Sequence, residues 1–154
     1  MSREPNRTLP GRTVNTEIAG PNGEQALMIE ALPISTGDKV RVVFESAAER
    51  WRHGIFIATE GELRTEDAIS RAYTIWADNA PPETILEVME TDGRLVFYNI
   101  WFSGRHAGFE SQRYTSGMLR EDLDDGWIRY RCLDFGGEPY AFDSIVFRLR
   151  IESP

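Results

Sequence analysis

The sequence has little of what marks secreted or membrane-anchored proteins. Among 154 residues there is one cysteine, Cys132, so no intramolecular disulfide can form, which excludes a disulfide-dependent secreted scaffold. Residues 1–7 contain no apolar segment of the kind found in secretory signals, and no apolar run approaches the length of a membrane span. We therefore expect a protein of the reducing cytoplasm that does not bind membranes.

Positive charge is also scarce. The net charge is −8, and an acidic surface repels phosphate backbones, so we expect no nucleic-acid partner. Of the 17 basic residues only Lys39 is a lysine, and the others are arginines. Codon preference explains such a bias, and so does selection of guanidinium groups for contacts with carboxylates or phosphates.

Motifs for catalysis and cofactor binding are missing. The chain has no nucleophile elbow, no phosphate-binding loop and no glycine fingerprint between a strand and a helix. Its two histidines, His53 and His106, do not form the close pair that a cupin metal site uses. The acidic residues of 122–125 do not follow the calcium-loop pattern, so solvated turn acids are favoured over a calcium site. We accordingly expect no cofactor and no metal.

Alternation of apolar and polar residues dominates what is present. Residues 39–45, 127–132 and 145–151 alternate cleanly, and turn residues separate them from similar segments. Residues 65–77 fit either a helical stripe or a turn followed by a strand, and the surrounding strands favour the second. Polar residues 1–12 predict a flexible N-terminal arm, and residues 13–154 predict a single domain.

Residues 84–104 form the centre of the expected fold. Two apolar runs flank Asp92-Gly93, which is a strong signal for a two-residue hairpin turn that would bring Val88 opposite Phe97. Both faces of this hairpin are apolar, so we expect it in the middle of a packed sheet. A second hairpin is expected at the Asp-Gly pair of residues 125–126, with Cys132 buried on its return strand.

About eight or nine strands with little helix predict an all-β fold, an antiparallel β-sandwich or jelly roll. A cupin-like or lipocalin-like barrel is the alternative. From about residue 25 onward, the strand pattern resembles the galactose-binding-like and carbohydrate-binding sandwich domains. This resemblance is one of architecture alone, and a shared architecture does not imply a shared function.

The polar loop 103–117 is the main candidate site. Glycines frame it, and loops on rigid β scaffolds often carry binding groups. Arginines and amides donate hydrogen bonds, carboxylates accept them and aromatic rings stack on sugars, so the loop could hold a polyol or a carboxylate; a merely solvated loop is the alternative. The candidate ligand-binding residues are Trp51, Arg105, His106, Glu110, Gln112, Arg113, Tyr114 and Trp127. For the two tryptophans, packing in the core is the alternative.

Two further features could carry function. Arg129, Arg131, Arg148 and Arg150 would form a basic patch if their strands are neighbours, although pairing with acidic residues is favoured. Asn99 lies within a strand, where a buried amide needs hydrogen-bond partners.

Three functions are ranked from these observations. The first is a non-catalytic protein that binds a polar small ligand, such as a carbohydrate, or a protein partner through loop 103–117. The second is a small enzyme that uses His106 and Glu110, with or without a metal and His53. The third is an assembly protein that forms a homodimer through outer apolar positions: Val43, Tyr98 and Val146.

Overall fold

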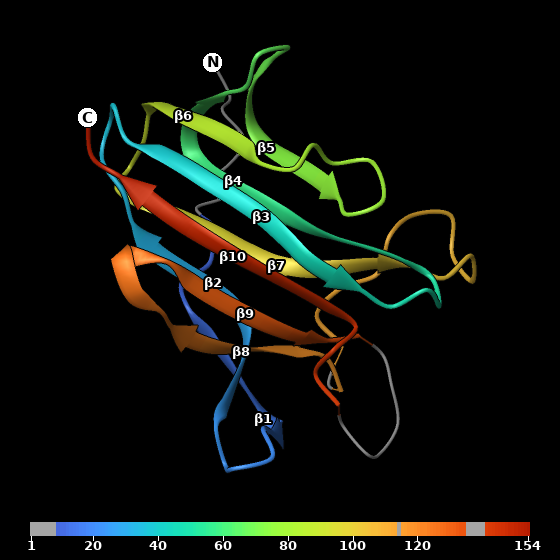
Figure 1. The fold of residues 1–154 in the computed structure, drawn as a ribbon. Helices are drawn as coiled ribbons and strands as arrows, with labels where there is room; N and C mark the ends of the chain where they lie inside the picture. Colours follow the sequence, from blue (N-terminus) through green and yellow to red (C-terminus); the bar gives the residue numbers. More distant parts are fainter. Residues whose placement is uncertain (1–8, 114, 135–140) are drawn as a thin grey trace, which may run out of the picture.

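The computed structural model describes residues 9–113, 115–134 and 141–154, which form an antiparallel β structure with almost no helix (Figure 1). The described residues contain no helix with the length and apolar character needed to cross a bilayer. A single 3₁₀ turn, η1 (Asp124–Gly126), joins β8 to β9. The strands are β1 (Thr13–Ala19), β2 (Gln25–Pro33), β3 (Lys39–Ala47), β4 (Arg52–Arg64), β5 (Ile69–Trp76), β6 (Thr84–Glu90), β7 (Arg94–Phe102), β8 (Gly117–Asp122), β9 (Ile128–Leu133) and β10 (Ile145–Glu152).

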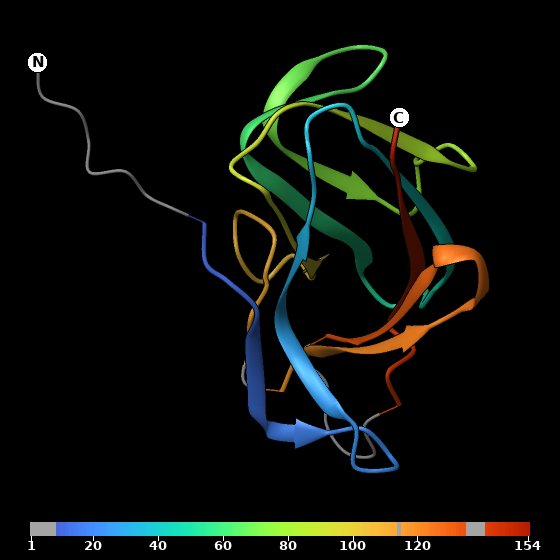
Figure 2. The same ribbon diagram turned by 90° about the vertical axis from the view of Figure 1, so that its left-hand side faces the viewer.

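The sheet closes on itself. Eight strands follow one another in the order β2-β7-β4-β6-β3-β10-β9-β8, and β8 returns to β2 through the pair Leu27 and Met118. Strands β1 and β5 lie outside this ring, paired with β2 and β4 (Figure 2). The all-β antiparallel structure expected from the sequence is confirmed, but the sheet closes into a barrel of eight strands and does not form the expected sandwich or jelly roll. Alternation predicts one buried face per strand, and either architecture satisfies that requirement.

The Asp92-Gly93 turn does not make the predicted hairpin. Strand β5 pairs with both halves of β4, so β6 and β7 share the other edge of β4, with β7 along residues 52–59 and β6 along 62–64. Among the described pairings β6 and β7 never pair with each other, and Val88 does not face Phe97. The turn therefore joins β6 and β7 end to end at a corner. Together the two strands form one long antiparallel partner along a single edge of β4.

Strand β4 bends at the same corner because of Gly61. Its φ is 151°, and a Cβ atom there would lie 2.1 Å from the carbonyl oxygen of Glu90. The backbone N–H of Asp92 donates to the carbonyl of Glu60 at 3.0 Å beside it. Close approach of two backbones requires glycine here, and the bend lets β4 contact both β7 and β6.

The barrel interior is filled with side chains. Aromatic rings pack at its centre, where Phe97 contacts Tyr130 at 5.0 Å and Tyr130 stacks on Phe147 at 5.2 Å between ring centroids. A smaller apolar cluster, which includes Ile18 and Leu119, packs β1 against the outside of the barrel. The interior is therefore a core, and any ligand site must lie on the outer surface or at the loops.

Several local predictions are confirmed. Residues 69–76 form a strand after a turn, and β8 and β9 form the second expected hairpin, with Asp122 opposite Ile128. Cys132 is fully buried on β9, and burial raises the pKa of its thiol well above the ordinary value. Most of the arm predicted over residues 1–12 lies outside the described residues, but Arg12 contacts the carboxylate of Glu30.

Candidate functional site

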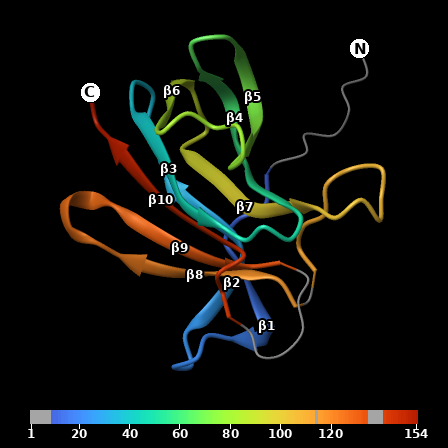
Figure 3. The same ribbon diagram turned by 45° about the vertical axis from the view of Figure 1, so that its right-hand side comes forward.

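Two loops gather at one end of the barrel. The β3–β4 connection, residues 48–51, leads into β4, and the β7–β8 connection, residues 103–116, follows β7, which pairs with β4. The two connections lie close together in both Figure 1 and Figure 3. Asp134, which follows β9, lies at the same end because β9 runs antiparallel to β8. We call this end of the barrel the loop end.

Glu110 is the centre of the loop end. Its backbone exchanges two hydrogen bonds with Trp101, at 3.1 and 2.7 Å, which ties the long loop to β7. Its buried carboxylate accepts hydrogen bonds from Ser103 at 2.5 Å and from Arg105 at 3.1 Å. The loop is therefore built around one carboxylate.

Two further side chains approach the same carboxylate. His106 Nε2 and Arg113 Nη2 each lie 3.5 Å from Glu110 Oε1. Burial alone would raise the pKa of Glu110, but hydrogen bonds from Ser103 and Arg105 outweigh burial and lower it. Glu110 is consequently an anion at neutral pH, surrounded by two arginines and a histidine.

The indole of Trp51 lies beside this cluster. The guanidinium carbon of Arg50 is 3.9 Å from the centroid of its ring, and that of Arg105 is 5.0 Å away. Trp51 has a φ of 66°, a conformation that is strained for a bulky residue. Arg105 thus contacts both the indole and Glu110, and it joins the two loops into one surface.

The structure brings together five of the predicted site residues at the loop end. The five are Trp51, Arg105, His106, Glu110 and Arg113.

The outcome differs for each of the other three predicted site residues. Gln112 is exposed, and its hydrogen bond to the hydroxyl of Tyr98 moderates the rise that burial causes in the pKa of Tyr98. Tyr114 lies outside the described residues. Trp127 is half-buried at the opposite end of the barrel, where the guanidinium of Arg148 lies 4.9 Å from its ring. The prediction that joined Trp127 to the loop site is wrong, since β9 begins at the far end from Asp134.

Sequence reasoning missed a buried pair at the loop end. His53 Nε2 lies 2.8 Å from a carboxylate oxygen of Asp134, and both side chains are almost completely buried. Arg50 lies 3.5 Å from the other oxygen of this carboxylate. His53 was expected in a loop but is on β4, and the closeness of residues 81 positions apart leaves no signal in the local sequence.

The arrangement does not combine these residues into a metal centre. No three His, Cys, Asp or Glu side chains within the described ranges come close enough to hold a metal ion. His53 is engaged with Asp134, and His106 with Glu110. Asn99 supports the loop end instead, because its amide donates to the carbonyl of Leu133 at 3.1 Å.

The strands that carry the four arginines of the predicted stripe are neighbours, and Arg148 pairs with Arg129 across β10 and β9. Arg129 contacts Glu45 at 2.8 Å and Glu121 at 3.2 Å, so acidic residues neutralise much of the stripe. Its role is therefore mainly to pair charges across the sheet, which is the interpretation that the sequence favoured.

The expected assembly surface is not continuous. Val146 is buried, and Tyr98 stacks on Phe56 with ring centroids 5.0 Å apart.

Comparisons with protein family models, with curated proteins and with solved structures each find no match for this chain.

Proposed function

We propose that the protein binds a small polar molecule bearing a carboxylate or phosphate group at the loop end, without transforming it. The observation that carries the proposal is the gathering of Arg105, His106 and Arg113 around one buried carboxylate. Within this cluster the two guanidinium groups of Arg105 and Arg113 lie beside the single carboxylate of Glu110. Guanidinium groups hold carboxylates and phosphates through paired hydrogen bonds.

The indole of Trp51 supplies the second part of such a site. Its half-buried ring lies beside Arg105, so a ligand held by the guanidinium would contact the aromatic face. Aromatic faces stack on sugar rings and on planar groups. A sugar acid or a phosphorylated sugar combines both requirements.

Binding can be measured by calorimetry and tryptophan fluorescence with glucuronate, glucose 6-phosphate and glucose as probes. We expect the two anionic probes to bind and glucose to bind at least tenfold more weakly. Arg105→Gln should weaken binding about tenfold, which is the loss expected for one charge-assisted hydrogen bond. Arg71→Gln, on β5, removes the same charge away from the loop end and should leave binding unchanged. No binding of any probe at 10 mM, or equal loss in both variants, would contradict the proposal.

Acid–base catalysis by His106 and Glu110 is a second candidate, because their side chains lie 3.5 Å apart. The lowered pKa of Glu110 weakens this candidate, since a general acid must hold its proton near neutral pH. If His106→Ala abolished turnover of a bound probe while preserving its affinity, catalysis would replace simple binding.

A further inference from the structure

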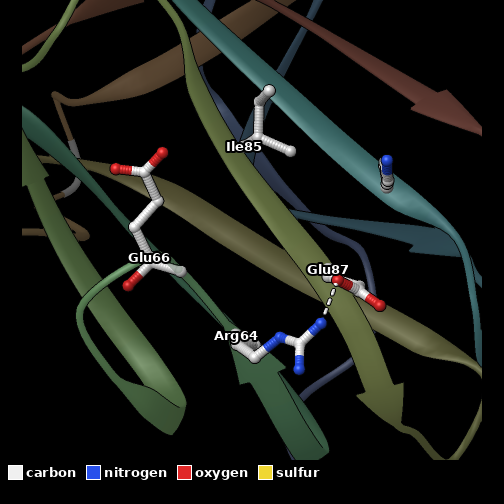
Figure 4. Close-up of a pocket in the computed structure, with 6 residues that line it drawn as sticks. Arg64, Glu66, Ile85 and Glu87 are labelled. Atoms are coloured by element: carbon white, nitrogen blue, oxygen red, sulfur yellow. Dashed lines mark hydrogen bonds and ion pairs between the residues drawn. The ribbon is translucent and has the colours of Figure 1, made fainter.

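A groove lies on the outside of the barrel, away from the loop end. It consists of two adjoining hollows of about 460 and 380 Å³ that share Thr65, Glu66 and Ile85. The turn from β4 to β5 forms one wall, and the beginning of β6 forms the other (Figure 4). Apolar side chains line its floor, among them Trp76 and Pro81.

Strand β5 presents an open edge to this groove. Among the described strands it pairs with β4 alone. The hydroxyl of Ser70 donates to the carbonyl of Ala72 at 2.9 Å and accepts from its N–H at 3.3 Å, so these backbone groups face away from β4. Backbone groups of alternate residues in a strand face the same way, so those of Thr74 also point outward. Thr74 lines the groove, and its N–H and C=O are available for pairing.

The charges around the groove leave an acidic excess. Arg64 pairs with Glu87 at 2.6 Å, as Figure 4 shows, and Arg41 pairs with Glu83. Glu66 and Asp67 are exposed and form no ion pair with any described residue.

Lys39 lies only in the larger hollow, and the smaller hollow is lined by acidic residues without a basic one. The end of the groove beside Thr74 is therefore negative.

We propose that this groove binds an extended segment of a partner protein in which basic and apolar residues alternate. The segment would add to β5 through the backbone of Thr74, as peptides add to open sheet edges. Its basic side chains would lie near Glu66 and Asp67, and its apolar side chains would cover Ile85, which is 40% exposed. This site is independent of the ligand proposed for the loop end.

The probe is an acetylated and amidated hexapeptide that alternates lysine and valine, and a glutamate–valine peptide is its control. In heteronuclear NMR at low salt we expect the lysine peptide to shift the amide signals of Thr74 and Ile85, and the glutamate peptide to shift neither. Glu66→Gln combined with Asp67→Asn should weaken binding about fivefold, as expected for two exposed ion pairs. Asp124→Asn with Asp125→Asn changes the net charge equally at the β8–β9 turn and should leave the affinity unchanged.

A second pair of variants tests the backbone contact. Thr74→Pro removes the outward N–H, and with it the amide signal of residue 74, and should abolish the shift at Ile85, whereas Thr74→Val keeps the N–H and should preserve both shifts. Circular dichroism of both variants checks that the barrel is retained. Equal binding of the two peptides, or shifts confined to other surfaces, would overturn the proposal. Concentration-dependent dimers that Thr74→Pro abolishes would overturn it too, by identifying a second copy of the chain as the occupant.

Discussion

The hydroxyl of Tyr130 donates a hydrogen bond to the carboxylate of Glu30 at 2.8 Å, inside the barrel and across 100 positions of the sequence. Arg12 lies 2.7 Å and Arg120 lies 3.3 Å from the same carboxylate. Strands β2 and β8 share one residue pair, so this cluster fills the seam where the ring of strands closes. The backbone N–H of Ala31 also donates to it at 2.9 Å, and a fully buried carboxylate is stable there because it has these four partners.

Substitution at this seam should reveal how much the cluster stabilises the barrel. We expect Glu30→Gln to lower the free energy of unfolding by about 3 kcal/mol, because it removes the charge that compensates two arginines. Tyr130→Phe leaves both ion pairs intact and should lower it by about 1 kcal/mol. Urea denaturation followed by tryptophan fluorescence measures both values, and a larger effect for Tyr130→Phe would contradict this ranking.

Alkaline pH should destabilise the barrel through two buried groups. Burial and the charge of Glu30 raise the pKa of Tyr130 above its ordinary value of 10.0, and burial raises that of Cys132 above 9.0. A raised pKa in the folded state means that the stabilisation is complete below the unfolded pKa and declines as pH rises above it. Urea denaturation should therefore give similar stabilities at pH 7 and 8, and a progressive loss above pH 9.

Two variants show which of the two buried groups causes the loss of stability at alkaline pH. Tyr130→Phe should remove the part that begins near pH 10, and Cys132→Ala the part that begins near pH 9. An unchanged slope in both variants would show that other groups cause the loss.

Substitution of Gly61 tests how closely the two backbones approach each other at the corner where β4 bends. Gly61→Ala should lower the free energy of unfolding by about 3 kcal/mol, because its Cβ would lie 2.1 Å from the carbonyl oxygen of Glu90. Gly108→Ala is the matched control, since nothing lies within 4 Å of a Cβ at that position. Thermal unfolding of the two variants compares them directly, and equal melting temperatures would refute a tight corner.

Glu110 should hold the long loop in place. Glu110→Gln removes the charge that Arg105, His106 and Arg113 share, and we expect a loss of about 2 kcal/mol together with faster hydrogen exchange over residues 103–113. Because the pKa of Glu110 is lowered, its stabilisation is present above the ordinary value of 4.5 and is lost as pH falls below it. The variant should therefore lose less stability than the parent between pH 5 and 3, and an identical acid profile would contradict this assignment.

Much of the secondary structure and part of the loop site follow from local patterns. Alternation located the strands, including β5 in an ambiguous segment, and it predicted that Cys132 is buried. The composition of the sequence pointed to the loop that carries Arg105 and Glu110, because a run of polar residues between glycines is unsuited to the hydrophobic core. These features depend on residues within a few positions of one another.

Strand pairing did not follow from the same patterns. The residues Asp92 and Gly93 allow a tight turn, but they do not specify whether the strands on either side pair with each other or with a third strand. That choice depends on β4, which bends at Gly61 and takes both β6 and β7 along one edge. The same dependence explains why the sequence predicted a sandwich where a closed barrel forms.

By itself the sequence determined the buried face of regularly alternating strands such as β3, where Val40 and Val42 are buried, because successive side chains of a strand point to opposite sides. Only the tertiary structure decided which strands are neighbours, and with them the burial of Glu30 and the contact of His53 with Asp134. Backbone hydrogen bonds are alike for every residue type, so the pairing of strands is selected by closure of the whole ring and not by any short stretch of the chain.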